Sequence, residues 1–158
     1  MAVRAFLSYA WESTSHNQWV ADLATRLRTD GIESILDQWA LAPGDQLSRF
    51  MEDSVRESDF VLVVLSPKYK LRSDTRQGGV GYEGDIMTAE VFTGTSRRKF
   101  IPLLRVAPHS AAAPTWLLGS KYINFEGTPF LEDSYVALLD ALHGRAGMPP
   151  PIGRRSQA

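Results

Sequence analysis

The stretch Phe60-Val61-Leu62-Val63-Val64-Leu65 is an unbroken run of six apolar residues, rich in branched and aromatic side chains. Its length suits a β-strand, and the lack of alternation with polar residues indicates a strand buried on both faces. Strands of this kind are typical of the centre of a parallel sheet that helices cover on both sides. The run therefore predicts an α/β fold.

Shorter apolar runs on both sides of this stretch predict four more strands. Two precede it, at Val3 to Ser8 and Ile32 to Leu36. Two follow it, at Phe100 to Leu104 and at Tyr122-Ile123. Amphipathic segments separate these runs, and strands that alternate with helices indicate a parallel sheet with right-handed crossovers.

The first two expected helices carry end signals. Trp19 to Leu27 has apolar residues at helical spacing, and Asp30-Gly31 predicts a left-handed cap after it. Leu47 to Val55 is the second helix, with Asp45 as its candidate N-cap.

The later helices are separated by longer polar segments. A polar loop from Ser66 to Gly81 is expected before a third helix. The residues expected in that helix are Ile86, Met87, Glu90 and Val91. Thr128-Pro129 is expected to open a last helix that carries Tyr135 and Leu138.

The order of elements predicts a flavodoxin-like fold, a five-stranded parallel sheet flanked by helices. Folds of this kind collect their functional loops at the carboxyl ends of the strands. We expect one domain over residues 1–143 and a linker or disordered tail over residues 144–158, which are rich in proline and arginine. This tail suggests one domain of a longer protein.

Composition excludes several classes of function. The 158 residues carry 17 Lys and Arg against 18 Asp and Glu, a net charge of −1, so we expect this domain to bind neither nucleic acid nor an anionic membrane. There is no cysteine, which excludes disulfides and thiolate chemistry. No run approaches the roughly 20 apolar residues of a membrane helix, and no signal peptide is evident, so we expect a cytoplasmic protein.

Aromatic and acidic residues follow the first two strands. Tyr9 and Trp11 come directly after the first strand, and Trp39 follows the second on a loop from Asp37 to Asp45. A planar ligand could stack on such side chains. The alternatives are that they cover the end of the sheet or form a partner surface.

The segment from Gly78 to Gly84 is glycine-rich but lacks the spacing of a phosphate-binding loop. Its informative residue is Glu83, which shares a helical face with Met87 and Glu90 in the expected third helix. From the residues alone, Glu83 is either a catalytic carboxylate at a strand end or an acid that favours the helix dipole. The three histidines lie far apart in sequence, so no metal site is expected.

Several segments in order resemble the SEFIR branch of the TIR superfamily, over roughly residues 3 to 125. Two stretches are most specific: Asp37-Gln38-Trp39 with Pro43-Gly44-Asp45, and Gly78 to Glu83. The supporting segments are Ala5 to Tyr9, Trp19 to Leu27 and Val61 to Tyr69. The resemblance implies the same five-stranded fold. It also implies one of two functions, cleavage of NAD or non-enzymatic binding between like domains.

The resemblance also implies the site residues. The family's essential glutamate begins the helix after the third strand; Glu83 matches that position, and Glu90 is the alternative because the preceding loop is long. Gly81-Tyr82 stands where the family usually has Trp-Cys. The substrate-binding residues implied are Tyr9, Trp11, Trp39, Asp45 and Tyr82.

These residues lead us to expect an NAD glycohydrolase with NAD as substrate and no cofactor or metal. We expect oligomerisation to activate it, through residues 37–45 and a sensor module fused to this domain, in bacterial antiphage defence. The alternatives are a non-enzymatic TIR or SEFIR adapter and an enzyme resembling nucleoside 2-deoxyribosyltransferases.

Overall fold

The computed structural model describes residues 2–75, 82–83, 86–87, 97–145, 147 and 149–155. Its centre is a five-stranded parallel sheet in the order β2-β1-β3-β6-β7. The strands are β1 (Arg4–Ser8), β2 (Glu33–Ile35), β3 (Phe60–Leu65), β6 (Phe100–Leu104) and β7 (Ile123–Asn124). This confirms the predicted sheet, with the apolar run of β3 as its middle strand.

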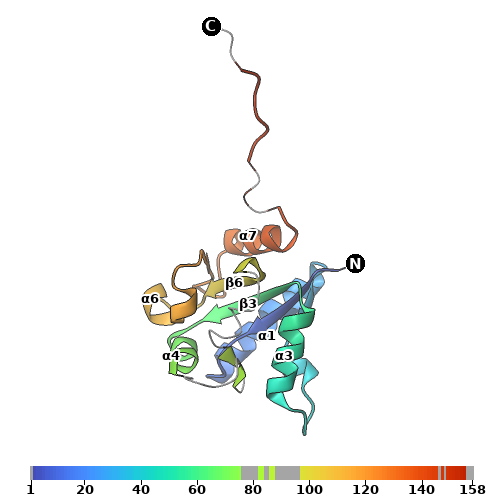
Figure 1. Cartoon of the computed structure of the whole chain (residues 1–158), viewed down its shortest axis with the longest axis vertical. Helices are drawn as coiled ribbons and strands as arrows, with labels where there is room; N and C mark the ends of the chain where they lie inside the picture. The colour runs from blue at the N-terminus through green and yellow to red at the C-terminus, as the bar shows by residue number, and fades with distance from the viewer. Residues whose placement is uncertain are drawn as a thin grey trace.

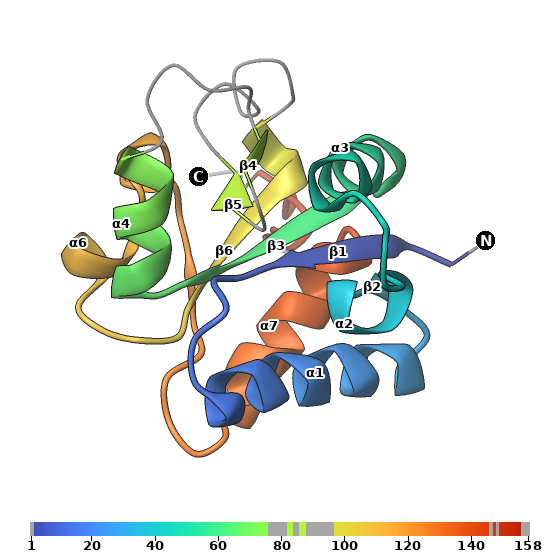
Figure 2. The same ribbon diagram turned by 90° about the horizontal axis from the view of Figure 1, so that it is seen from below.

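Helices cover both faces of the sheet (Figure 1). Helices α1 (Thr14–Thr29) and α7 (Glu132–Leu142) lie on one face. Helices α3 (Leu47–Glu57), α4 (Pro67–Thr75) and the short α6 (His109–Ala112) lie on the other, as Figure 2 shows from below. Three one-turn segments are also described: α2 (Asp37–Ala40), η1 (Arg97–Lys99) and η2 (Thr115–Leu117).

The alternation of side chains in β3 builds two apolar cores. Leu62 and Val64 point into the core under α1 and α7. Val61, Val63 and Leu65 point into the core under α3, α4 and α6. Every one of these five side chains is fully buried, as expected for a central parallel strand.

Helix α1 ends as its sequence predicts. Ser13 is the N-cap, and its hydroxyl accepts a hydrogen bond from the His16 N–H at 3.1 Å. Asp30 is the C-cap, and the next residue, Gly31, has a φ of +90°. The predicted left-handed stop at Asp30-Gly31 is confirmed.

Three predictions about helix ends and loops are wrong. The segment expected as a polar loop contains helix α4. Asp45 does not cap α3: the N-cap is Gln46, and the Asp45 carboxylate accepts from the Ala42 N–H at 2.8 Å instead, which closes a turn. Helix α7 begins at Glu132, beyond the expected Pro129.

Residues 149–155 extend away from the domain and are exposed (Figure 1). Within the described residues, none of the helices has the length and apolar character needed to cross a membrane.

Candidate functional site

The order of the strands places a topological switch point between the ends of β1 and β3. These two strands are neighbours, but the chain leaves β1 toward β2 and leaves β3 toward β6. The loops that follow them therefore diverge at the carboxyl edge of the sheet. In open α/β sheets, ligands bind at such a switch in strand order. We name this place the switch-point crevice, formed by the loops after β1, β2 and β3.

Asp37, the first residue of α2, links the loops after β1 and β2. Its side chain is only 4% exposed. One carboxylate oxygen accepts a hydrogen bond from the Tyr9 hydroxyl at 2.8 Å, and the other accepts from the Trp11 indole N–H at 2.7 Å. Hydrogen bonds to an ionised acceptor are stronger than neutral ones. Asp37 therefore fixes the position of the Trp11 ring.

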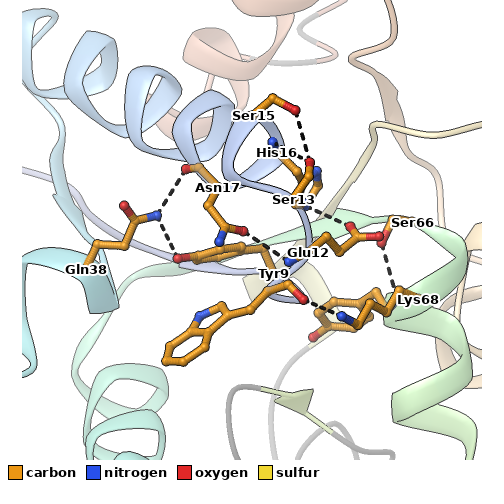
Figure 3. Close-up of polar contacts among 11 residues, drawn as sticks. Tyr9, Glu12, Ser13, Ser15, His16, Asn17, Gln38, Ser66 and Lys68 are labelled. Atoms are coloured by element: carbon orange, nitrogen blue, oxygen red, sulfur yellow. Dashed lines mark hydrogen bonds and ion pairs between the residues drawn. The ribbon is translucent and has the colours of Figure 1, made fainter.

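Gln38 extends this network toward α1. Its side-chain amide nitrogen donates to the Tyr9 hydroxyl at 2.8 Å and to the Asn17 carbonyl at 3.0 Å. In Figure 3, Gln38 lies to one side of Tyr9 and Asn17, and its amide nitrogen is joined to both. The Tyr9 hydroxyl is thus held between an acceptor, Asp37, and a donor, Gln38.

Helix α4 closes the other side of the crevice. The Lys68 ammonium donates to the Trp11 carbonyl at 2.6 Å (Figure 3). Tyr69, the next residue of α4, makes two further contacts. Its hydroxyl is 2.9 Å from the Ser8 hydroxyl, and its backbone N–H donates a hydrogen bond to the Ser66 hydroxyl at 3.2 Å. The backbone of Trp11 is therefore held by α4 while its ring is held by Asp37.

His16 and Glu12 form a pair at the start of α1. The His16 Nε2 lies 3.1 Å from a Glu12 carboxylate oxygen. Burial lowers the pKa of His16, with Arg105 and Lys68 acting in the same direction and Glu12 opposing them. Burial of the imidazole therefore favours its neutral form.

A sequence model of the TIR domain matches residues 5–139 of this chain. This chain belongs to the TIR domain family. The matched residues run from β1 into α7 and include all five strands of the main sheet.

Two solved structures share the fold. A prokaryotic SEFIR domain superposes with a TM-score of 0.80 at 31% identity, covering 97% of this chain and all of that one. The TIR domain of the Toll-related receptor TRR-2 from Hydra magnipapillata superposes with a TM-score of 0.54 at 19% identity, over 77% of this chain and 82% of that one. The SEFIR likeness agrees with the branch expected from the sequence.

One curated relative carries an enzymatic name. The NAD(+) hydrolase PdTIR of Paracoccus denitrificans (strain Pd 1222) is 39% identical over 64 residues. The match covers 40% of this chain and 21% of the relative, so the aligned part spans only about a fifth of that protein's length.

Tyr9 and Trp11 differ in their exposure to solvent. Tyr9 is 2% exposed, so its ring is covered in this structure, and its hydroxyl donates to the Asp37 carboxylate. Trp11 is 47% exposed and lies beside the crevice. Only Trp11 of this pair presents an aromatic ring to solvent.

Trp39 and Asp45 lie on the segment after β2. Trp39 is 45% exposed, and the guanidinium carbon of Arg28 is 5.3 Å from its ring centroid. Asp45 is exposed and holds the turn at Ala42. Trp39 therefore packs beside α1, and neither residue makes a described hydrogen bond to the Asp37 network.

Tyr82 and Glu83 form the short strand β4 (Tyr82–Glu83), which pairs antiparallel with β5 (Ile86–Met87). The predicted helix start at Glu83 is therefore wrong; the sequence has glycine at positions 81 and 84, and glycine disfavours a helix. Strand β4 contacts α3, and β5 contacts α4. The alternative carboxylate, Glu90, lies outside the described residues.

The sequence did not single out Asp37, Gln38 or Lys68 as site residues. Asp37 had a signal, since an acid directly after a buried strand stands at the carboxyl edge of the sheet. Lys68 had none, because its segment was expected to be a loop. Among the described residues, no cluster of three His, Asp or Glu could hold a metal ion.

Proposed function

We propose that this TIR domain cleaves NAD to nicotinamide and ADP-ribose or a cyclic ADP-ribose product. The observation that carries the proposal is the half-exposed Trp11 ring, held by Asp37 and Lys68 at the switch-point crevice. An aromatic ring fixed beside a crevice is suited to stack a planar base. The similarity to an NAD(+) hydrolase supports the same substrate.

The main requirement of NAD cleavage is that the protein stabilises the positive charge that develops on the ribose. Nicotinamide is attached through a positively charged nitrogen and leaves as a neutral molecule, so no general acid is required. Positive charge develops on the ribose as the bond breaks, and a carboxylate beside the sugar stabilises it. We assign this role to Glu83, with Glu90 as the alternative. NAD is the substrate, and neither a cofactor nor a metal takes part.

We further propose that assembly activates the domain. In this proposal the segment from Asp37 to Asp45 meets a neighbouring copy, and Trp39 supplies an exposed contact. Tyr82 contacts the substrate beside Glu83. A sensor module fused to the domain would drive assembly in a bacterial antiphage response.

The test is nicotinamide release from NAD by assembled protein, with assembly checked by light scattering. Glu83→Ala is expected to abolish release, while Glu90→Ala retains it. If only Glu90→Ala lost nicotinamide release, the domain would still cleave NAD, but the catalytic carboxylate would be Glu90. No release from an assembled wild-type sample would contradict the proposal.

A non-enzymatic adapter is the second candidate. The observation that favours it is the same exposed Trp39, which suits a docking surface as well as an assembly contact. Self-association that Trp39→Ala weakens, in a sample that leaves NAD intact, would support the adapter.

A further inference from the structure

A cavity opens on the α1 and α7 side of the carboxyl edge. Its volume is about 620 Å³. The start of α1 and the loops after β6 and β7 line it, through Ser15, His16, Trp19, Arg105 to Ala107 and Glu126 to Thr128. None of these residues belongs to the Trp11, Asp37 and Lys68 set. Cavities of a few hundred cubic ångströms accommodate small-molecule ligands.

Arg105 is held rigidly at the edge of this cavity. Its Nη1 donates to the carbonyls of Phe125 and Gly127, each at 2.9 Å, and to that of Pro129 at 3.1 Å. Its guanidinium carbon lies 4.4 Å from the Trp19 ring centroid. Trp19 in turn donates to the Pro129 carbonyl at 2.9 Å. The cation is thus positioned before any ligand arrives.

The guanidinium retains donors for a ligand. Within the described part of the chain, Nε and Nη2 of Arg105 have no hydrogen-bond partner. Burial lowers the pKa of Arg105, with Glu126 acting in the opposite sense, so this cation has lost part of its hydration. A planar guanidinium matches phosphate oxygens with two parallel hydrogen bonds.

Glu126 provides the complementary group. It lines the same cavity and is half-buried, and no ion pair joins it to Arg105 in this structure. A carboxylate that lies near a phosphate-binding group is suited to accept hydrogen bonds from the two hydroxyls of a ribose. The hydroxyls of Ser15 and Thr128 add further polar groups, and Val106 adds an exposed apolar one.

We propose that this cavity binds the phosphorylated ribose of a nucleotide, with the phosphate on Arg105 and the ribose hydroxyls on Glu126. This site is separate from the switch-point crevice, on the opposite face of the sheet from β4 and β5. The proposal does not depend on NAD cleavage, because it concerns binding alone.

The first experiment maps the binding of ADP-ribose to the full 158-residue chain by amide chemical shifts. We expect the largest shifts at residues 15–16, 105–107 and 126–128. Shifts confined to residues 8–12, 37–38 and 66–68 would place ADP-ribose in the crevice and overturn the proposal. Absence of shifts at millimolar ADP-ribose would also overturn it.

The second experiment measures dissociation constants by calorimetry. Arg105→Gln is expected to weaken ADP-ribose binding by about tenfold or more, since it removes a charge-assisted contact. Arg49→Gln, an exposed arginine on α3, is the control and should bind as the wild type does. Equal binding by Arg105→Gln and the wild type would overturn the assignment.

Glu126→Ala tests the ribose contact. It removes only a side chain, so the three backbone carbonyls that accept hydrogen bonds from Arg105 remain. It should reduce the preference for ribose 5-phosphate over inorganic phosphate, whereas Glu57→Ala on α3 should not. An unchanged preference would overturn the ribose assignment. These experiments measure binding and not turnover, so failure of NAD cleavage and failure of this site remain distinguishable.

Discussion

Asp37 is the residue on which the loops after β1 and β2 converge, and its carboxylate is buried with hydrogen bonds from Tyr9 and Trp11. Asp37→Asn replaces an ionised acceptor by a neutral amide. We expect it to lower the free energy of unfolding by about 2 kcal/mol, because hydrogen bonds to a charged group contribute more than neutral ones. Urea unfolding measures this change, and the Trp11 fluorescence should shift with it.

Asp45→Asn is the matched control. Asp45 is exposed, and its described hydrogen bond is to one backbone N–H, so the substitution should cost less than about 0.5 kcal/mol. Equal costs for the two substitutions would mean that the Asp37 network adds nothing to stability.

Tyr135 gives the domain a sensitivity to alkaline pH. Its hydroxyl donates to the Asp30 carboxylate at 2.6 Å, and burial followed by this hydrogen bond raises its pKa. The unfolded chain releases the phenol proton near pH 10, while the folded chain keeps it. Stability should therefore fall as the pH rises above about 10. Tyr135→Phe should flatten that fall in urea titrations; a slope equal to the wild type would contradict this assignment.

For single residues, the sequence predicted their place in the fold better than it predicted which side chains they contact. Tyr9 and Trp11 were both expected at the end of the first strand, and both lie there. The sequence could not show that Tyr9 is buried, because its partners Asp37 and Gln38 are nearly thirty residues away in the chain. Burial of an aromatic side chain depends on such distant packing.

Among the elements, α1 depends on Gly31 to turn the chain into β2. Its φ of +90° strains any residue with a Cβ, although the surrounding space is open. Gly31→Ala should therefore cost about 1–2 kcal/mol. Gly119 also has open space but no positive φ, so Gly119→Ala is the control and should cost nothing. Thermal unfolding compares them, and equal stability of the two variants would contradict the strain at Gly31.

Helix α4 shows where the periodicity of the sequence fails. Only Tyr69 and Ser73 of this helix are buried, one turn apart, and one of them is polar. An apolar stripe is the signal of an amphipathic helix, and α4 has almost none. The prediction for the segment around Glu83 was wrong for another reason. Ile86 and Met87 were expected in a helix, but they form β5.

At the scale of the whole molecule, the strands were the most predictable part. Each predicted strand overlaps an observed one, because buried parallel strands carry dense apolar sequence. The place of the switch-point crevice follows from the order of the strands. The alternation of strands and helices in the sequence implied this kind of parallel sheet. The cavity at Arg105 could not be predicted, since it depends on three carbonyls of one loop converging on a distant guanidinium.

The C-terminal segment should be dispensable for folding. The described residues beyond Arg145 are exposed and extend away from the domain (Figure 1). A chain that ends at Arg145 should keep its free energy of unfolding within about 0.5 kcal/mol. Urea unfolding of both chains measures this, and a larger loss would show that the segment packs on the domain.

The proposed catalytic role of Glu83 is tested most directly by NAD turnover in the assembled wild type, Glu83→Gln and Glu90→Gln. The amide keeps the shape of the side chain and removes the charge that stabilises the ribose cation. We predict that Glu83→Gln lowers kcat by about 10²-fold or more with little change in KM, while Glu90→Gln retains wild-type kcat. Wild-type kcat in assembled Glu83→Gln would contradict the catalytic role of Glu83.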